Sequence, residues 1–393
     1  MTQPRRRTPA GSRLEELAAR TPTSRERYVD FLRAFSILVV VFGHWFIALI
    51  WWRDGRVGVH NVIGVTRGLW LATWVFQVIP LFFFVGGFSN AKVLEGSRRR
   101  GEPFSRFFRA RAERLLRPLA IFVAAWLAVQ LVAHLAGLGG SRLLRGGKLP
   151  FGPLWFLVVY VGAILLAPAM LGLHRRFGLR ALGGLVTLAA LVDLARFGAG
   201  VGRIGWVNLA FVWLIAHQLG FFYADGQLVR ASIRVHLWMV VVGLVGLVVL
   251  TSVGVYPKSM IGTDVERLSN MNPPTLPIVA LTFWQVGLAM LLRERVAAWL
   301  ARPGPWMGVI AANSMIMTLY LWHMTAFTTA ILLLYPLGLG RPTSGTASWW
   351  VQRPIWILVP GLILAALVKV FGRFERPPSA VAMPGIPPGS PAS

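Results

Sequence analysis

Residues 33–44 read RAFSILVVVFGH, an apolar run that begins with Arg33 and ends with His44. An α-helix rises 1.5 Å and turns 100° per residue, so the eleven steps between these side chains give about 16 Å along the axis and about 20° around it. Both side chains would therefore lie on one face of a helix. In a membrane, Arg33 would lie at the surface and His44 near the centre of the bilayer, where a polar side chain requires a reason.

The composition of the whole chain indicates a membrane protein. The 393 residues are 56% hydrophobic and 14% charged, with a mean hydropathy of +0.63 and 17 tryptophans, which is typical of polytopic membrane proteins. We expect an all-α fold, a bundle of transmembrane helices, without disulfides because the sequence has no cysteine. The net charge of +26 comes from arginines that punctuate the apolar runs, which indicates positive-inside topology and no nucleic-acid partner.

Ten runs are long enough to cross about 30 Å of hydrocarbon. They cover approximately residues 34–52, 69–89, 115–137, 153–173, 179–195, 205–223, 235–255, 276–293, 309–335 and 353–371. Lys and Arg are concentrated at both termini and in alternate loops, so we expect both termini in the cytoplasm and a multi-pass location in the plasma membrane. The expected organisation is a partly disordered cytoplasmic segment over 1–27, a transmembrane domain over 28–375, and a disordered Pro-rich tail over 376–393.

Polar side chains at membrane depth are candidates for function because burying them there is costly. His44 has an imidazole that is able to take a proton at physiological pH; the alternative is a neutral histidine bonded to a neighbouring helix. Arg33 is either its partner on the helix face or an ordinary interfacial side chain. Arg114 and Arg117, with Arg111 extending the row, place guanidiniums on one side of a helix at the cytoplasmic mouth of the third span. Such a row suits phosphates, although the positive-inside bias explains it equally well.

Other polar residues inside the spans narrow the choice of function. His323 and His217 each lie about halfway along an apolar run, where packing between helices and catalysis are the alternatives. Asp193 is the single acidic residue inside a predicted span, and this scarcity argues against a proton-coupled transporter. The sequence has no H-E-x-x-H, paired-carboxylate, G-x-S-x-G or P-loop signature. It therefore predicts no metal site and gives no support to metalloprotease, glycosidase or ATPase activity.

Several segments resemble motifs of the integral-membrane acyltransferase-3 family. RYVDFLRAFSILVVVFGHW (27–45) is similar to the opening helix of the family, with Arg33 and His44 at the expected spacing and Asp30 as the acid that precedes them. Four later motifs are matched in order by PLFFFVGGF (80–88), RLLRP (114–118), PLWFL (153–157) and TLYLWHM (318–324). The resemblance covers most of residues 27–371 and implies the ten-span layout.

Two positions depart from the pattern of the family. Gly86 stands where a serine is usual, so no hydroxyl can act there. Tyr160 stands where many members carry a glutamate, so no carboxylate can assist at that position. These departures suggest a subfamily with its own acceptor, and the likeness to more distant membrane N-acetyltransferases keeps an amine acceptor open.

The resemblance implies transfer of an acetyl or other short acyl group from acyl-CoA, as co-substrate, to a hydroxyl of a carbohydrate, glycolipid or secondary metabolite. No permanently bound cofactor is expected. Arg111, Arg114 and Arg117 would hold the phosphates of the donor, while His44 would act as general base on the acceptor hydroxyl, on the same helix face as Arg33.

The expected substrate-binding residues are Trp155, Tyr160, His323, Asn313 and Tyr320. The first two would wall the acyl channel, and Asn313 and Tyr320 are candidates to stabilise the oxyanion. A multi-span transporter or lipid flippase, and a structural membrane protein whose histidines only pack, remain the alternatives.

Overall fold

The computed structural model describes residues 25–53, 56–137, 148–340 and 346–375, together with Glu15, Ala18, Thr21 and Pro22. Most of the expected cytoplasmic segment over 1–27 and the whole of the expected tail over 376–393 lie outside the described residues. Within them, nine helices are long and apolar enough to cross a membrane. The chain is thus a polytopic bundle of helices, as its composition predicts.

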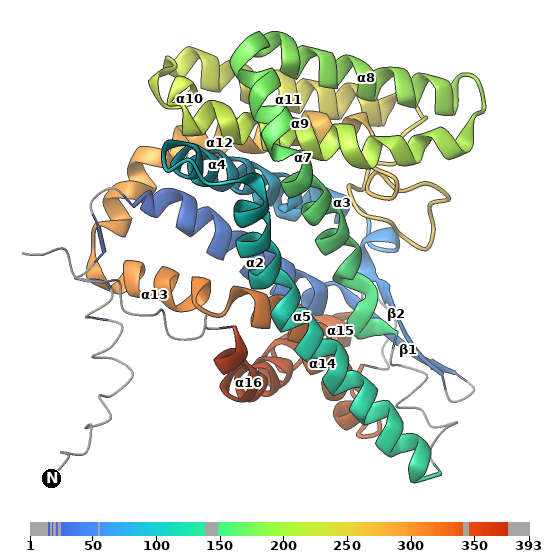
Figure 1. Cartoon of the computed structure of the whole chain (residues 1–393). Coiled ribbons are helices and arrows are strands. Elements are labelled where there is room, and N and C mark those ends of the chain that lie inside the picture. Colours follow the sequence, from blue (N-terminus) through green and yellow to red (C-terminus); the bar gives the residue numbers. More distant parts are fainter. Residues whose placement is uncertain are drawn as a thin grey trace, which may run out of the picture.

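The order of the elements is given in Figure 1. The helices are α2 (Arg27–Phe46), α3 (Trp70–Phe76), α4 (Ile79–Arg99), α5 (Phe104–Leu135), α7 (Trp155–Phe177), α8 (Leu179–Phe197), α9 (Asn208–Ala224), α10 (Gln227–Arg230), α11 (Ile233–Ser252), α12 (Leu276–Leu300), α13 (Pro303–Asn313), α14 (Ile316–Leu334), α15 (Ala347–Val351) and α16 (Arg353–Phe371). Short 3-10 turns cover Val62–Gly64, Leu149–Leu154, Gly202–Val207 and Gly372–Phe374. The strands β1 (Ala48–Arg53) and β2 (Arg56–Asn61) pair antiparallel.

An inner layer of buried helices is surrounded by exposed ones. Helices α9 and α14 are mostly buried, whereas α5, α11 and α16 are mostly exposed, as expected of helices that face lipid. At the centre, α4 and α9 approach backbone to backbone. A Cβ on Gly87 would lie 1.9 Å from the carbonyl oxygen of His217, and one on Gly220 would lie 2.1 Å from that of Phe84. Glycine at both positions is therefore what allows this close packing of membrane helices.

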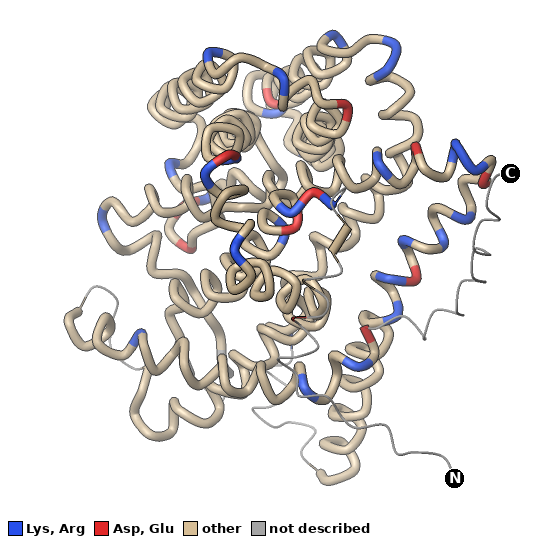
Figure 2. Tube along the Cα trace, turned by 90° about the vertical axis from the view of Figure 1, so that its left-hand side faces the viewer, with Lys and Arg blue, Asp and Glu red and all other residues tan. Residues whose placement is uncertain are grey.

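The two ends of the bundle differ in character. The hairpin of β1 and β2 lies at one end, and α10 lies at the other (Figure 1). Figure 2 views the molecule from the α10 end and shows many Lys and Arg positions there. We therefore expect the α10 end to face the cytoplasm. The orientation stays a prediction.

The first span lies earlier in the chain than the predicted 34–52. Helix α2 begins at Arg27 and ends at Phe46, and the chain then continues into the hairpin. The sequence WWRDGR (51–56) contains the Asp-Gly pair that favours a two-residue hairpin turn, flanked by residues that favour strands. His44 consequently lies in the last turn of α2 rather than in the middle of a longer helix.

The ninth run, expected over 309–335, is two helices. α13 ends at Asn313 and α14 begins at Ile316. The start of α14 is capped by the carboxylate of Glu375, which accepts hydrogen bonds from the backbone N–H groups of Met317 and Thr318, both at 2.9 Å. These donors have no partner within the helix itself, so an acid from the far end of the chain fixes where α14 starts.

Helix α8 coincides with the fifth predicted span but is not among the nine apolar helices, because it carries Arg180, Asp193 and Arg196. Asp193 is buried and accepts hydrogen bonds from the Asn208 side chain at 2.9 Å, the Tyr256 hydroxyl at 2.9 Å and the backbone N–H of Leu276 at 2.8 Å. This acid therefore connects α8 to α9, to the loop between α11 and α12, and to the start of α12.

Candidate active site

Arg33 is fixed at the start of the site by two helices. Its guanidinium forms an ion pair with Asp30 at 3.0 Å on α2 and donates to the Ser89 hydroxyl of α4 at 2.7 Å. Asp30 also pairs with Arg25 at 2.6 Å. Ser89 in turn accepts, through its carbonyl oxygen, a hydrogen bond of 2.8 Å from Arg111 of α5. Two guanidiniums from different helices thus meet at one serine.

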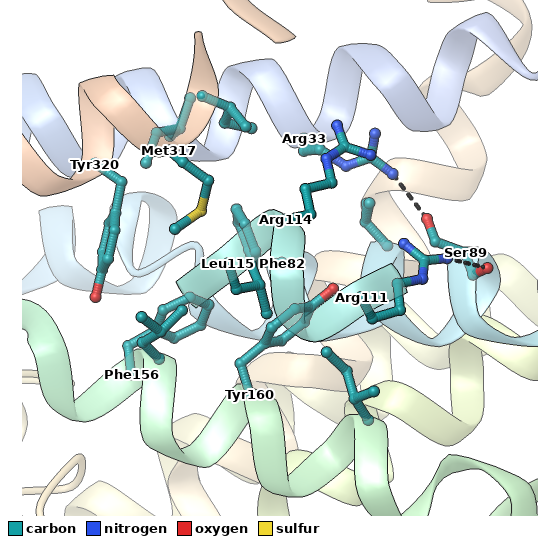
Figure 3. A pocket seen from close by; sticks show the side chains of 15 residues that line it. Arg33, Phe82, Ser89, Arg111, Arg114, Leu115, Phe156, Tyr160, Met317 and Tyr320 are labelled. Atoms are coloured by element: carbon teal, nitrogen blue, oxygen red, sulfur yellow. Dashed lines mark hydrogen bonds between the residues drawn. The ribbon is translucent and has the colours of Figure 1, made fainter. Parts of the chain in front are cut away.

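These residues open onto a cavity of about 80 Å³ between α2, α4, α5, α7 and α14 (Figure 3). Polar side chains are gathered toward one end of the cavity: Arg33, Ser89, Arg111, Arg114 and Tyr160. The rest of the lining is apolar or aromatic: Ile37, Phe82, Val85, Leu115, Phe156, Leu157, Ile164, Ile316, Met317 and Tyr320. Figure 3 shows the guanidiniums at the Ser89 end and Tyr320 at the opposite end.

Two of the polar lining groups are available to a ligand. Arg114 makes no hydrogen bond or ion pair with another described residue, and neither does the Tyr160 hydroxyl. Three guanidiniums therefore face the cavity, whose lining, among the described residues, contains no carboxylate, and Asp30, which pairs with Arg33, is already shared with Arg25. This excess of positive charge suits an anionic group such as a phosphate.

His44 lies on the cavity side of α2. Phe35, Leu38 and Phe42 form the outer exposed stripe of this helix, and at 100° per residue His44 lies about 180° from Phe35 but only about 20° from Arg33. Its side chain is nevertheless exposed. His44 does not line the cavity itself, but by this periodicity it lies on the face of α2 that carries Arg33, which does.

A second histidine faces His44. The ring centroids of His44 and His323 of α14 are 5.2 Å apart, and His323 is fully buried. The two Nδ1 atoms lie 2.7 Å from the Val40 carbonyl oxygen and 2.6 Å from that of Tyr320, respectively. A carbonyl oxygen only accepts, so each Nδ1 carries a proton, and when the ring is neutral its Nε2 presents a lone pair. The Nε2 of His323 has no hydrogen-bond partner among the described residues.

The histidine pair is connected to the cavity by Tyr320. This residue lines the cavity, and its ring lies 6.2 Å from that of His323. On the other side, the indole N–H of Trp45 donates to the His323 carbonyl oxygen at 3.1 Å, which fixes α2 against α14. The guanidiniums, the aromatic part of the cavity lining and the two imidazoles therefore follow one another along α2.

A buried arginine holds the end of α2 beside His44. Arg353 of α16 donates to the carbonyl oxygens of Phe46 at 3.5 Å and Ala48 at 3.2 Å, and its guanidinium lies 4.0 Å from the centre of the Trp349 ring. The first carbonyl belongs to the last residue of α2, where the helix leaves its acceptors unpaired, and the second to the first residue of β1. Neither Arg353 nor Ser89 is marked by a sequence pattern, because both act through contacts with distant segments.

The structure gathers some of the predicted residues and separates others. Arg33, Arg111, Arg114, Tyr160 and Tyr320 line the cavity. His44 and His323 form the adjoining pair.

Three other predicted residues belong neither to the cavity lining nor to the histidine pair. Arg117 is exposed. Trp155 is 38% exposed and its ring packs on Phe156 and Trp213. Asn313 is on α13, not on the histidine-bearing helix, and donates to the carbonyl oxygens of Asp30 at 2.8 Å and Val309 at 3.0 Å.

His217, the other intramembrane histidine, is buried against α4. Its Nε2 lies 3.0 Å from the amide nitrogen of Asn90, and its ring packs on Phe221 at 4.8 Å. It does not line the cavity. Across the part of the chain that the structure describes, no group of three or more His, Cys, Asp or Glu side chains is arranged to hold a metal ion.

Comparison with known proteins gives one match. A family model described as an acyltransferase domain matches residues 26–373, nearly the whole chain. Neither a curated protein nor a solved structure matches significantly. The matched region contains every residue of the cavity and of the histidine pair.

Proposed function

This chain belongs to the integral-membrane acyltransferase-3 family and is a membrane acyltransferase, and we propose that it transfers an acetyl or other short acyl group from acyl-CoA to a hydroxyl. The acceptor class that we propose is a carbohydrate, a glycolipid or a secondary metabolite. The protein would work in the plasma membrane, with the guanidinium end of the cavity facing the cytoplasm.

The observation that carries the proposal is the excess of guanidinium over carboxylate at one end of the cavity. Arg33, Arg111 and Arg114 face a space that no acidic side chain in the described part of the chain lines, and the one acid paired with Arg33, Asp30, is shared with Arg25. A donor that carries several phosphates supplies the missing negative charge through charge-assisted hydrogen bonds. Acyl-CoA is such a donor, and its nucleotide would remain at this end.

The dimensions of α2 fit the arm of the same donor. Arg33 and His44 are about 16 Å apart along the helix axis, and the lining between the guanidiniums and Tyr320 is apolar and aromatic. The pantetheine arm of acyl-CoA is a chain of comparable length. A donor bound by its phosphates would therefore extend past Tyr160 and bring its thioester toward the histidine pair.

His44 is the base in the proposed reaction because its side chain is accessible, whereas His323 is fully buried. The Nε2 of His44 takes the proton of the acceptor hydroxyl as its oxygen attacks the thioester carbonyl. The new C–O bond forms, the C–S bond breaks, and the proton passes from the imidazolium to the departing thiolate of CoA. His323, the neighbouring imidazole, positions the ring of His44 from α14.

Neither Asn313 nor Tyr320 is free for the oxyanion. The amide of Asn313 donates to two backbone carbonyls, and the Tyr320 hydroxyl donates to the carbonyl oxygen of Pro153 at 2.5 Å. The proposed mechanism therefore gives Asn313 a structural role and makes Tyr320 a wall of the passage.

The test uses the full chain in nanodiscs with radiolabelled acetyl-CoA and, as the matched probe, acetyl-pantetheine, which has the same thioester without the nucleotide. We expect saturable binding of acetyl-CoA, slow release of CoA, and much weaker binding of acetyl-pantetheine. Folded protein that neither binds nor cleaves acetyl-CoA would overturn the donor assignment. Passage of intact labelled compound into sealed vesicles containing the protein would instead identify a transporter.

A further inference from the structure

Tyr160 divides the cavity between its guanidinium end and its Tyr320 end (Figure 3). Its ring stacks on Phe156 at 5.7 Å and meets Phe82 and Phe83 of α4 edge-on, both at 5.8 Å. A ring packed against three others has little freedom to rotate away. The hydroxyl points toward the guanidinium side (Figure 3).

Gly86 is the reason that the ring fits there. A Cβ built on Gly86 would lie 2.8 Å from Cε2 of the Tyr160 ring and 3.2 Å from its hydroxyl oxygen. The ring thus lies in a notch on α4 that exists only because residue 86 has no side chain. Gly86 does not line the cavity itself, since Tyr160 covers it. Any side chain at position 86 would push the ring toward the open space.

The space that remains beside Tyr160 is narrow. The cavity measures about 80 Å³, roughly half the volume of an engineered apolar cavity of about 150 Å³ that binds benzene. A ring that is held in place on one side of so small a space leaves little room for bulk beside it.

We propose that Tyr160, seated against Gly86, is the residue that selects the acyl donor by its width. The inference rests on the proposed function, in which the acyl end of the donor passes Tyr160 before it reaches His44. Acetyl and straight short acyl groups pass the ring, and branched or cyclic acyl groups are excluded. Tyr160 is a specificity-determining residue, and Gly86 is the position that allows its conformation.

The two positions are also those at which the chain departs from the motifs that it otherwise resembles. Residues 86 and 160 are on different helices, α4 and α7, yet they contact each other. A serine at 86 would collide with the ring at 160. The two departures are therefore one structural change, which replaces a hydroxyl and a carboxylate by a single aromatic ring.

The experiment compares n-butyryl-CoA with isobutyryl-CoA, which contain the same atoms and differ only in branching. Each competes with radiolabelled acetyl-CoA for the protein in nanodiscs. A misplaced methyl in a closely fitting apolar site changes discrimination by about 10- to 200-fold. We expect wild type to prefer the straight isomer by about tenfold or more, and Tyr160→Ala to lose this preference. Tyr160→Phe, which retains the ring, is the matched control and should keep it.

The second arm tests the contact with Gly86. Gly86→Ala should weaken the binding of every acyl-CoA by driving the ring into the cavity, and Gly86→Ala/Tyr160→Ala should restore binding without the preference. A straight-chain preference that survives Tyr160→Ala would overturn the proposal, as would wild type that binds acetyl-CoA and does not distinguish the isomers. Failure of the proposed function looks different, because wild type would then bind no acyl-CoA at all.

Discussion

The two ends of the site are built in opposite ways. At one end, Asp30 and Ser89 hold the charged Arg33 and Ser89 also holds Arg111, and Arg114 beside them has no partner among the described residues. At the other, His44 and His323 each hold a protonated Nδ1 on a backbone carbonyl, so that in the neutral rings the Nε2 atoms present lone pairs.

The difference separates binding from chemistry. Guanidiniums in excess attract an anion over several ångströms, whereas an imidazole acts on the proton that it touches. Both ends are attached to α2, since Arg33 and His44 share one face of it. Substitutions at the guanidinium end should therefore change the affinity for the donor. Substitutions at the histidine end should change the rate at which the bound donor is cleaved.

The largest effect is expected at the histidine end. His44→Ala removes the proposed general base, and general-base catalysis typically contributes about 10²- to 10⁴-fold. We expect the rate of acetyl-CoA cleavage to fall by that factor while the dissociation constant for acetyl-CoA stays the same. Single-turnover cleavage and equilibrium binding measure the two quantities separately. His134→Ala, at an exposed position of α5, is the control; equal losses in both variants would remove His44 from the mechanism.

The next effect is expected at the guanidinium end. Arg114→Ala removes a cation that faces the cavity, and a hydrogen bond to a charged group is worth about 1.5–3 kcal/mol. Affinity for acetyl-CoA should therefore fall by about 10- to 150-fold. The rate at which bound acetyl-CoA is cleaved should change little. Arg117→Ala, three residues away on the same helix but outside the cavity, is the matched control and should bind like wild type. Similar losses in both would point to the net charge of α5 rather than to this cavity.

A smaller effect is expected at the serine between the guanidiniums. Ser89→Ala removes the hydroxyl that accepts from Arg33 but leaves the carbonyl that accepts from Arg111. A net hydrogen bond of about 0.5–1.5 kcal/mol corresponds to a two- to twelvefold loss of affinity, roughly. Isothermal titration with CoA would measure it. If Ser89→Ala slows acetyl-CoA cleavage while the affinity for CoA stays constant, binding and chemistry are not separated between the two ends.

The smallest effect on function is expected at Asn313. Asn313→Ala leaves the buried carbonyl oxygen of Asp30 without this donor, which costs about 1–3 kcal/mol of stability. Thermal unfolding in nanodiscs should shift downward, while cleavage per folded molecule stays at the wild-type value. A specific loss of rate without a change in unfolding would restore the oxyanion role that the sequence suggested.

Local periodicity was enough to predict much of this site. The shared face of Arg33 and His44 follows from the helical repeat alone, and the hydropathy of the runs predicted the bundle of helices. The family motifs then indicated His323, Tyr160 and the arginine row of α5. All of these depend on residues within a few helical turns of one another.

Contacts between distant segments could not be predicted in the same way. The carboxylate that caps the start of α14 belongs to Glu375, which is more than fifty residues from Met317 and Thr318 in the sequence. Spacing at i and i+3 puts Arg114 and Arg117 on one side of α5, but only neighbouring helices decide that the first faces the cavity and the second does not. The notch at Gly86 likewise has no signal in the sequence, because its occupant comes from another helix.

The bond from Trp45 to His323 also orders events during synthesis. These residues are 278 positions apart, and Arg353 contacts Ala48 across 305 positions. At about 5–20 residues per second, α2 leaves the ribosome roughly 15 to 55 s before α14 does. Throughout that interval the nascent chain has His44 without its neighbour and without the arginine that closes α2. Under the proposed function, an unfinished chain in the translocon would therefore cleave no acyl-CoA until α14 and α16 are inserted.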